Sequence, residues 1–358
     1  MKNRDVSLDM VKGWLIVCLV FHHISDIGLY KVGYEDNVVL NLIEQIGNPL
    51  YACYFMQAFF VITGLCSTFD KELKPFILNQ FKGLLVPTIC FTLVYQIYYC
   101  GISDFPRIVK QIVVYGGDFW FLYAMFFCKV AYYLLYRFVP KRWLMPLLLM
   151  ACLVGSLLNV LNLVPNYFWH RQILDFILFV GIGHQYKEKL MNISLLKVGF
   201  AYIATVGIAY ALCGNNLPMV TAGFNSSLLC WPLHLMLSVF GTLAVIALAK
   251  RVKADDMTTY IGRKSMMVFI IQVYANGYFL HLFKDKLTSG VFMESAIAVL
   301  VMVCSIVSLA IVIEYILDHS LLRFMLGKPI KLKNKSSFTP PTPISEININ
   351  KFAYSVVS

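Results

Sequence analysis

Long apolar segments alternate with short polar connections along almost the whole chain. Each apolar segment comes close to the roughly 20 residues that a helix needs to cross the hydrocarbon core of a bilayer. We therefore predict an all-α membrane bundle of about ten transmembrane helices, near residues 12–29, 49–69, 84–101, 118–137, 143–162, 171–187, 196–213, 219–249, 265–282 and 291–317. The eighth contains Pro232, and a kink or a tilt is expected there.

The end of the chain differs from the rest. From about Pro329 onward it is polar and contains the run TPPTP. Such a segment has too few apolar residues to offset the entropy of ordering. We predict a membrane domain over 1–328 and a disordered cytoplasmic tail over 329–358. No internal repeat is evident.

Composition and charge support a membrane protein and fix an orientation. Hydrophobic residues make up 59% of the chain and charged residues 14%, against about 25% charged residues in soluble domains. Of the 30 Lys and Arg residues, 23 lie on the side of the N-terminus, six lie on the other side, and Lys129 lies inside a span. This asymmetry predicts cytoplasmic termini, and it explains the net charge of +11 without a nucleic-acid partner.

The cysteines and the N-terminus exclude two other interpretations. Most of the 10 cysteines lie in apolar runs without a CxxC pair, so we expect neither a disulfide framework nor a metal site. The apolar segment that follows the basic N-terminus lacks an Ala-x-Ala cleavage signal and carries two histidines. We therefore expect a retained first span rather than a cleaved signal peptide.

A histidine pair lies in the outer half of the first span, and charged residues flank its cytoplasmic end. His23 follows Lys12 by eleven residues, a spacing that returns to nearly the same helix face about 16 Å further along. Ionisable groups are costly inside a membrane and indicate a functional site. The spacing suggests a reaction site that is reached from the cytoplasm.

His23 is the candidate general base. A neutral imidazole accepts a proton from a hydroxyl that attacks an acyl carbonyl, and Asp26 is near enough on the helix to orient the ring. His22 points about 100° away and fits that role less well. The alternative is an interfacial histidine that bonds to a neighbouring helix.

The donor-binding candidates lie at the cytoplasmic ends of helices. They are Arg4, Asp9, Lys12 and Lys82. The three basic residues would place cations where a cytoplasmic donor carries its phosphates. The alternative is the ordinary cationic flank of an inner helix end.

Several further residues are candidates for lining a cavity. Thr63 and Gly64 end the sequence FFVITG, and Trp120 opens the fourth span. Plain helix packing and an interfacial aromatic belt are the alternatives. Lys129, near mid-membrane, has to snorkel, pair with an anion or face a cavity.

Six segments in the same order resemble the acyltransferase 3 family of multi-span bacterial membrane enzymes. The family has a basic residue and, after ten positions, a histidine in its first helix, as Lys12 and His23 do. The other resembling segments are Phe59–Gly64, Lys82–Pro87, Trp120–Leu122, Gly181–Lys187 and Ile261–Ser265. The last segment adds Arg263 to the site candidates.

The resemblance implies transfer of an acyl group, usually acetyl, from a cytoplasmic acyl-CoA to a hydroxyl of a surface or lipid-linked glycan. It also implies a multi-pass protein of the inner (plasma) membrane, with acetyl-CoA as a co-substrate and no tightly bound cofactor. Gln272 stands where family members often have a histidine, and Thr63 replaces the usual serine.

Two alternatives stay open at the level of sequence. A glycan or lipid transporter or flippase shares the spans and the intramembrane charges but makes no acyl product. A membrane sensor or scaffold would leave the Lys12–His23 spacing unexplained.

Overall fold

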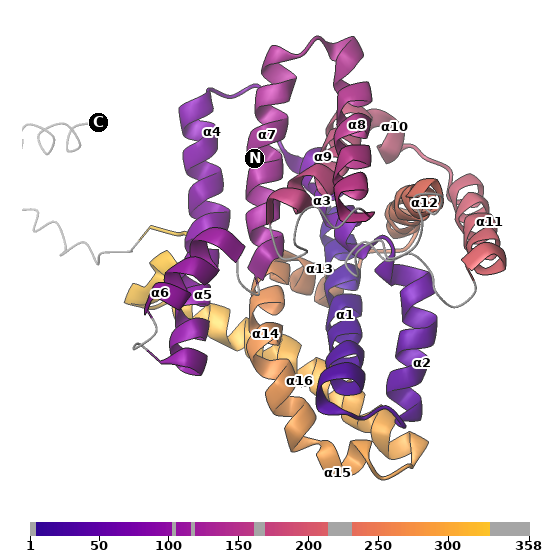
Figure 1. The fold of residues 1–358 in the computed structure, drawn as a ribbon, viewed down its shortest axis with the longest axis vertical. Coiled ribbons are helices and arrows are strands. Elements are labelled where there is room, and N and C mark those ends of the chain that lie inside the picture. Colours follow the sequence, from indigo (N-terminus) through magenta and orange to yellow (C-terminus); the bar gives the residue numbers. More distant parts are fainter. Residues whose placement is uncertain (1–4, 102–104, 116–118, 161–168, 214–230, 330–358) are drawn as a thin grey trace, which may run out of the picture.

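The computed structural model describes residues 5–101, 105–115, 119–160, 169–213 and 231–329, and the described part contains helices and no strand (Figure 1). Its first half comprises α1 (Val6–Ile27), η1 (Gly28–Val32), α2 (Val38–Gly47), η2 (Asn48–Ala52), α3 (Phe55–Cys66), α4 (Leu73–Gln80), η3 (Phe81–Leu85), α5 (Val86–Cys100), α6 (Phe105–Lys110) and η5 (Gln111–Tyr115). Next come α7 (Trp120–Phe138), α8 (Lys141–Val160), α9 (Trp169–Gln185), α10 (Lys187–Met191) and α11 (Leu195–Cys213). The last part comprises α12 (Trp231–Ala249), α13 (Asp256–Arg263), α14 (Ser265–Leu282), α15 (Lys284–Leu287), α16 (Phe292–Asp318) and η8 (Leu321–Leu326).

The all-α prediction is confirmed, and most of the predicted spans are helices that are long and apolar enough to cross a membrane. In the described part, seven helices are long and apolar enough to cross a membrane, and the pair α2 and η2–α3, bent by 49°, makes an eighth if it is one span. These eight correspond to eight of the ten predicted segments. The other two predicted spans are α7 and the 17-residue α9, which fall outside that set.

Several helices begin earlier than their apolar segments do. α1 starts at Val6, where the Asp5 side chain caps it by accepting a hydrogen bond from the backbone N–H of Ser7 at 3.0 Å. The third span is helical from Leu73 to Tyr99, so Lys82 lies inside a helix and not at its start. A helix whose terminal N–H groups are capped can extend beyond its apolar segment. Hydrophobicity alone therefore does not locate the end of the helix.

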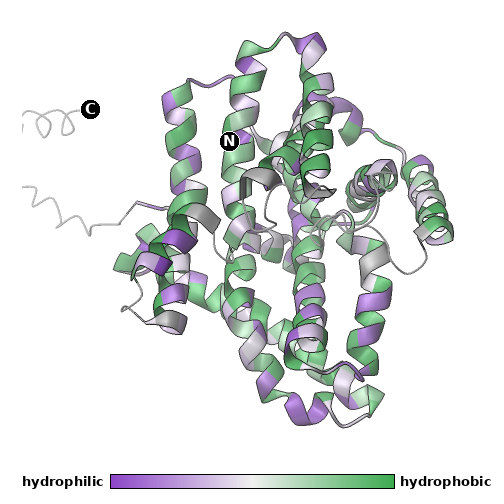
Figure 2. Cartoon of the chain, in the orientation of Figure 1, coloured by the Kyte–Doolittle hydropathy of each residue, from purple (hydrophilic) through white to green (hydrophobic). Residues whose placement is uncertain are grey.

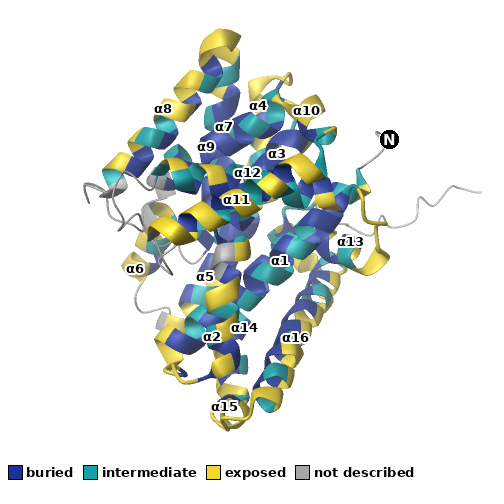
Figure 3. Cartoon of the chain, turned by 90° about the vertical axis from the view of Figure 1, so that its right-hand side faces the viewer, coloured by how far each residue is buried: buried dark blue, intermediate teal, exposed yellow. Residues whose placement is uncertain are grey.

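α1 is the central helix of the bundle. It packs against α2, α3, α12, α13, α14 and α16, and Figure 1 shows it in the interior. α11 is peripheral, and its exposed side chains include Leu196, Phe200 and Ile203. Figures 2 and 3 show that apolar residues cover its outward face. A bundle with apolar side chains on both its inner and outer faces is suited to a bilayer.

Two glycine pairs bring helix backbones close together. A Cβ added at Gly64 of α3 would collide with the backbone of α9 at Val180, and one at Gly183 would collide with the Val61 carbonyl. α1 and α13 meet in the same way, with Gly13 against Thr258 and Gly262 against the Asp9 carbonyl. Small residues at such crossings replace side-chain packing by backbone contact.

Candidate functional site

The N-terminal end of α1 carries a group of three charged residues. Asp9 is buried, at 2% exposure, and both its carboxylate oxygens face cations. Lys12 Nζ lies 2.5 Å from Oδ1, and Arg263 Nε of α13 lies 3.5 Å from Oδ2. The close approach of Gly13 and Gly262 to the facing helix makes this juxtaposition possible. The group carries a net single positive charge.

Both cations of this group remain accessible. The Arg263 side chain is 47% exposed and that of Lys12 is 21% exposed. A guanidinium has five N–H donors in a fixed fork, and the Nε of Arg263 faces Asp9. Asp9 therefore holds two partly exposed cations side by side. Its role in donor binding stays a prediction.

Lys264 ties the same segment to another helix. Its Nζ lies 2.8 Å from Oε1 of Glu314 on α16, and Lys328 Nζ lies 3.8 Å from the same oxygen. The adjacent Arg263 and Lys264 thus connect the α13–α14 junction to α1 and to α16. Their ion pairs hold these three helices together at this end of the bundle.

The other two donor-binding candidates do not join this group. Arg4 lies outside the described residues. Lys82 is exposed on η3, and its backbone carbonyl lies against Gly327, which has a left-handed φ of 69°. Among the described residues the Lys82 ammonium forms no ion pair.

The two histidines of α1 face different helices. His22 is buried, with Nδ1 4.0 Å from Oε2 of Glu44 on α2 and its ring 5.7 Å from the Phe55 ring on α3. His23 is partly buried, and its ring lies close to the side chain of Gln272 on α14 but outside hydrogen-bond geometry. The two imidazole centroids are 5.7 Å apart.

Asp26 is the residue predicted to orient the His23 ring. It interacts electrostatically with His22. Positions 22 and 26 are four apart, a spacing that brings side chains together on a helix. The role of Asp26 beside His23 stays a prediction.

Three amide side chains are buried without hydrogen-bond partners in the described part of the chain. They are Gln272 and Asn276 of α14 and Gln57 of α3, with exposures of 1% or less. Gln272 and Asn276 are four apart and share a helix face. An unsatisfied buried amide costs about 1–3 kcal/mol, so these groups mark positions that a substrate or water would satisfy.

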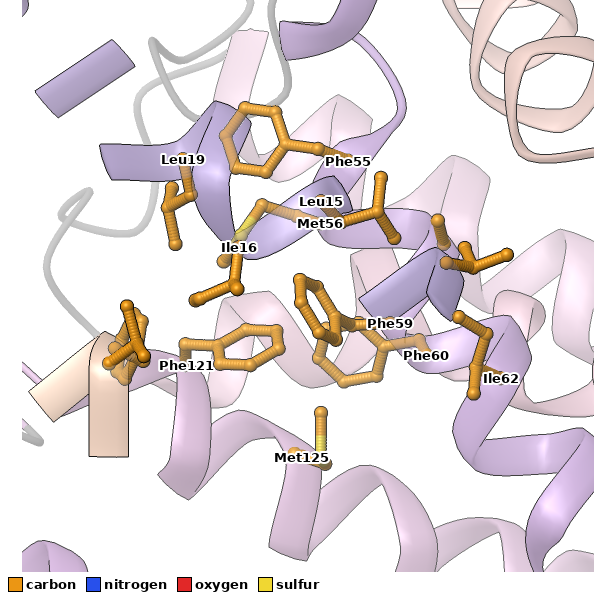
Figure 4. Packing of buried hydrophobic residues seen from close by; sticks show 14 of the residues in the cluster. Leu15, Ile16, Leu19, Phe55, Met56, Phe59, Phe60, Ile62, Phe121 and Met125 are labelled. Atoms are coloured by element: carbon orange, nitrogen blue, oxygen red, sulfur yellow. The ribbon is translucent and has the colours of Figure 1, made fainter. Parts of the chain in front are cut away.

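The aromatic motif residues form a packed core between α1, α3 and α7 (Figure 4). The rings of Phe59 and Phe60 lie edge-on to Phe121, with centroids 5.8 and 5.3 Å apart. Trp120 stacks on Phe176 at 6.2 Å. Thr63 Oγ1 contacts the Met125 sulfur at 3.6 Å. These contacts, and the packing of Gly64 on α9, match the packing alternative for the motif more closely than a cavity lining.

Among the described residues, no group of three or more His, Cys, Asp or Glu side chains could hold a metal ion. Buried Cys53, Cys128 and Cys152 are not in disulfide bonds.

A family comparison identifies the protein's class. A model described as an acyltransferase domain matches residues 5–315, nearly the whole chain. The chain belongs to the acyltransferase 3 family. No curated protein and no solved structure matches the chain significantly. Family membership and the apolar helices together establish a multi-pass membrane protein of an acyltransferase family, which favours the enzyme over the transporter and scaffold alternatives.

Glu44 is the residue of the histidine site that sequence interpretation missed. Glu44 falls between the predicted spans 12–29 and 49–69, whereas the structure places it on α2 against α1. The apolar positions Val39, Leu40, Ile43 and Gly47 recur at helical spacing around it. That periodicity was the available signal of a helix that carries an inward-facing carboxylate.

Proposed function

We propose that the protein is a membrane O-acyltransferase that moves an acetyl group from cytoplasmic acetyl-CoA to a hydroxyl of a surface or lipid-linked glycan. One observation carries this proposal. Lys12 and His23 lie on one unbroken helix at the centre of a bundle of the acyltransferase 3 family. Their separation corresponds to a rise of about 16 Å, from a cationic entrance to a buried polar group.

The donor would bind with its phosphates at the entrance. Lys12 and Arg263 present two oriented cations there, and Arg–phosphate contacts are frequently bidentate. The Asp9 carboxylate keeps both side chains in place and prevents mutual repulsion from separating them. The pantetheine arm would then extend along α1 toward the histidine pair.

The chemistry at His23 would be a balanced acyl transfer. His23 takes the proton of the acceptor hydroxyl while the hydroxyl oxygen forms a bond to the acetyl carbonyl carbon. The carbon–sulfur bond then breaks, and the imidazolium returns the proton to the departing thiolate. The unsatisfied Gln272 amide beside His23 would supply an N–H donor to the oxyanion of the tetrahedral intermediate.

Labelling of membranes tests this proposal. Inside-out vesicles from a strain that lacks the gene, complemented with wild type or with His23→Ala, are supplied with acetyl-CoA radiolabelled in the acetyl group. The vesicles contain their own acceptor. We expect label in the glycan or glycolipid fraction with wild type, and a loss of about 100-fold or more with His23→Ala, the scale of general-base catalysis.

His281→Ala is the matched control, because His281 is exposed at the far end of α14. Wild-type labelling is expected with that variant. Equal labelling by His23→Ala at equal membrane abundance would refute the assignment of the base. A transporter would give no acetylated product with any variant.

A further inference from the structure

A carboxylate on a second helix faces the histidine pair. Glu44 lies on α2, and its side chain is 14% exposed. Its Oε2 is 3.0 Å from Ser25 Oγ and 4.0 Å from His22 Nδ1. Ser25 is fully buried and also lies 2.9 Å from the His22 carbonyl oxygen. One carboxylate oxygen therefore contacts two residues of α1.

Placing the Glu44 carboxylate against α1 costs free energy, and packing alone does not account for it. A carboxylate on a membrane-embedded face is expensive unless it pairs or lies along a functional path. α2 directs it toward the central helix, where the ring of Phe55 lies 5.7 Å from that of His22. Asp26 also acts on His22, and Lys31 acts on His23 from η1. The histidine pair thus has two acidic groups beside His22 and a neutral amide beside His23.

The different surroundings of His22 and His23 suggest different roles for the two residues. In the transfer proposed above, His23 becomes positively charged for part of the cycle. Gln272 donates or accepts hydrogen bonds but carries no charge to balance that imidazolium. The adjacent His22 ring, at 5.7 Å, has an anion at ion-pair distance. In a low-dielectric site, such an anion stabilises a nearby cation far more than it does in water.

We propose that Glu44 is the positioning residue of the histidine pair. Its carboxylate, held by Ser25, orients His22 and supplies the negative charge that balances His23 when His23 accepts the proton. This inference rests on the proposed acyl transfer. Glu44 acts through its charge and through His22 and does not itself touch the donor.

Variants at Glu44 separate charge from shape. Glu44→Gln keeps the size and an oxygen that accepts from Ser25 but removes the charge. Glu44→Asp keeps the charge on a shorter stem. Ser25→Ala keeps the carboxylate and removes its hydroxyl partner. Glu35→Gln is the matched control, because Glu35 is an exposed acid in the segment just before α2.

The measurement is the rate of acetyl transfer from radiolabelled acetyl-CoA in inside-out vesicles, divided by the amount of protein in the membrane. For Glu44→Gln we expect kcat to fall about tenfold, within the range for residues of one interacting network. The KM for acetyl-CoA should stay unchanged, because the donor phosphates bind at the opposite end of α1. Glu44→Asp and Ser25→Ala should retain more activity than Glu44→Gln, and Glu35→Gln should match wild type.

A Glu44→Gln rate within twofold of wild type would overturn the inference. So would a Glu44→Asp rate as low as that of Glu44→Gln, because packing rather than charge would then decide. A loss that appears in membrane abundance or in KM, with kcat unchanged in all variants, would also assign Glu44 a purely structural role. Absence of label with wild type would instead reject the proposed acetyl transfer itself.

Discussion

Adjacent histidines on a central helix acquire different chemistry because they face different helices. A side chain turns by about 100° from one residue to the next, and here this turn takes His22 to Glu44 and His23 to Gln272. The sequence predicted the pair and its entrance cations but not their partners. Partners on other helices follow from how the bundle packs, which a single sequence does not state.

Gln272 allows a test at the scale of a residue. It is fully buried, and neither amide atom has a hydrogen-bond partner in the described part of the chain. We expect Gln272→Leu to leave the unfolding midpoint unchanged or to raise it, because no hydrogen bond is lost and an unpaired polar group is removed. Acetyl transfer should nevertheless fall about tenfold or more, the scale of an oxyanion donor.

Thermal unfolding of purified Gln272→Leu in detergent, alongside its transfer rate in vesicles, checks both parts. Gln272→Asn is the companion variant, because it keeps an amide on a shorter side chain. Its transfer rate should lie between those of wild type and Gln272→Leu. A lowered midpoint with an unchanged rate would show that Gln272 supports the fold and not the reaction.

At the scale of elements, close backbone crossings determine which motif residues are available for chemistry. Gly64 belongs to a family-like segment but lies against the backbone of α9. From the sequence, Thr63 and Gly64 were candidates for lining a cavity, and plain helix packing was the alternative. The crossing angle and the partner helix decide between them, and both depend on contacts distant in sequence.

Gly64→Leu should therefore disrupt the bundle. A Cβ at this position meets the Val180 carbonyl and the Gly183 backbone, so α3 and α9 have to separate, at a cost of typically 1–3 kcal/mol for overpacking. We expect lower membrane abundance and a lower unfolding midpoint. Gly199→Leu on peripheral α11 has nothing within 4 Å of its Cβ and should behave as wild type. Normal abundance of Gly64→Leu would contradict the direct backbone contact.

The ion pairs of Asp9 allow a second test at this scale. Asp9→Asn removes the buried anion from between Lys12 and Arg263, which leaves two cations facing each other. If these cations bind the donor phosphates, their displacement should raise the KM for acetyl-CoA several-fold, with a smaller effect on kcat. Titration of the initial rate against acetyl-CoA measures both. A fall in kcat with an unchanged KM would show that the donor does not bind at this end of α1.

At the scale of the whole molecule, the apolar segments identified the fold class and most of the elements. Hydrophobicity predicted eight segments that the structure confirms as candidate spans, counting the bent pair as one. The predicted segments 118–137 and 171–187 are also helices, α7 with Lys129 and Arg137 and the short α9, but neither is among the candidate spans. Both pack within the bundle through α7–α9 and α3–α9 contacts. Their burial depends on helix neighbours rather than on their own hydropathy.

The charge asymmetry predicts an orientation that accessibility measures. With cytoplasmic termini, the segment 250–255 faces the cytoplasm and the segment 288–291 faces outward. A cysteine introduced by Lys253→Cys should react with a membrane-impermeant maleimide only in inside-out vesicles, and one from Ser289→Cys only in intact cells. Wild type provides the background of native thiols, of which Cys66 and Cys304 are exposed. The opposite pattern would invert the proposed donor and acceptor sides.

The central claim, acyl transfer with His23 as the base, is tested most directly on the acceptor in the living cell. Proton NMR of total surface polysaccharide would compare a strain without the gene with the same strain complemented by wild type or by His23→Ala. We expect an O-acetyl signal that disappears with the gene and returns only with wild type. An identical spectrum in all three strains, or restoration by His23→Ala, would contradict the claim.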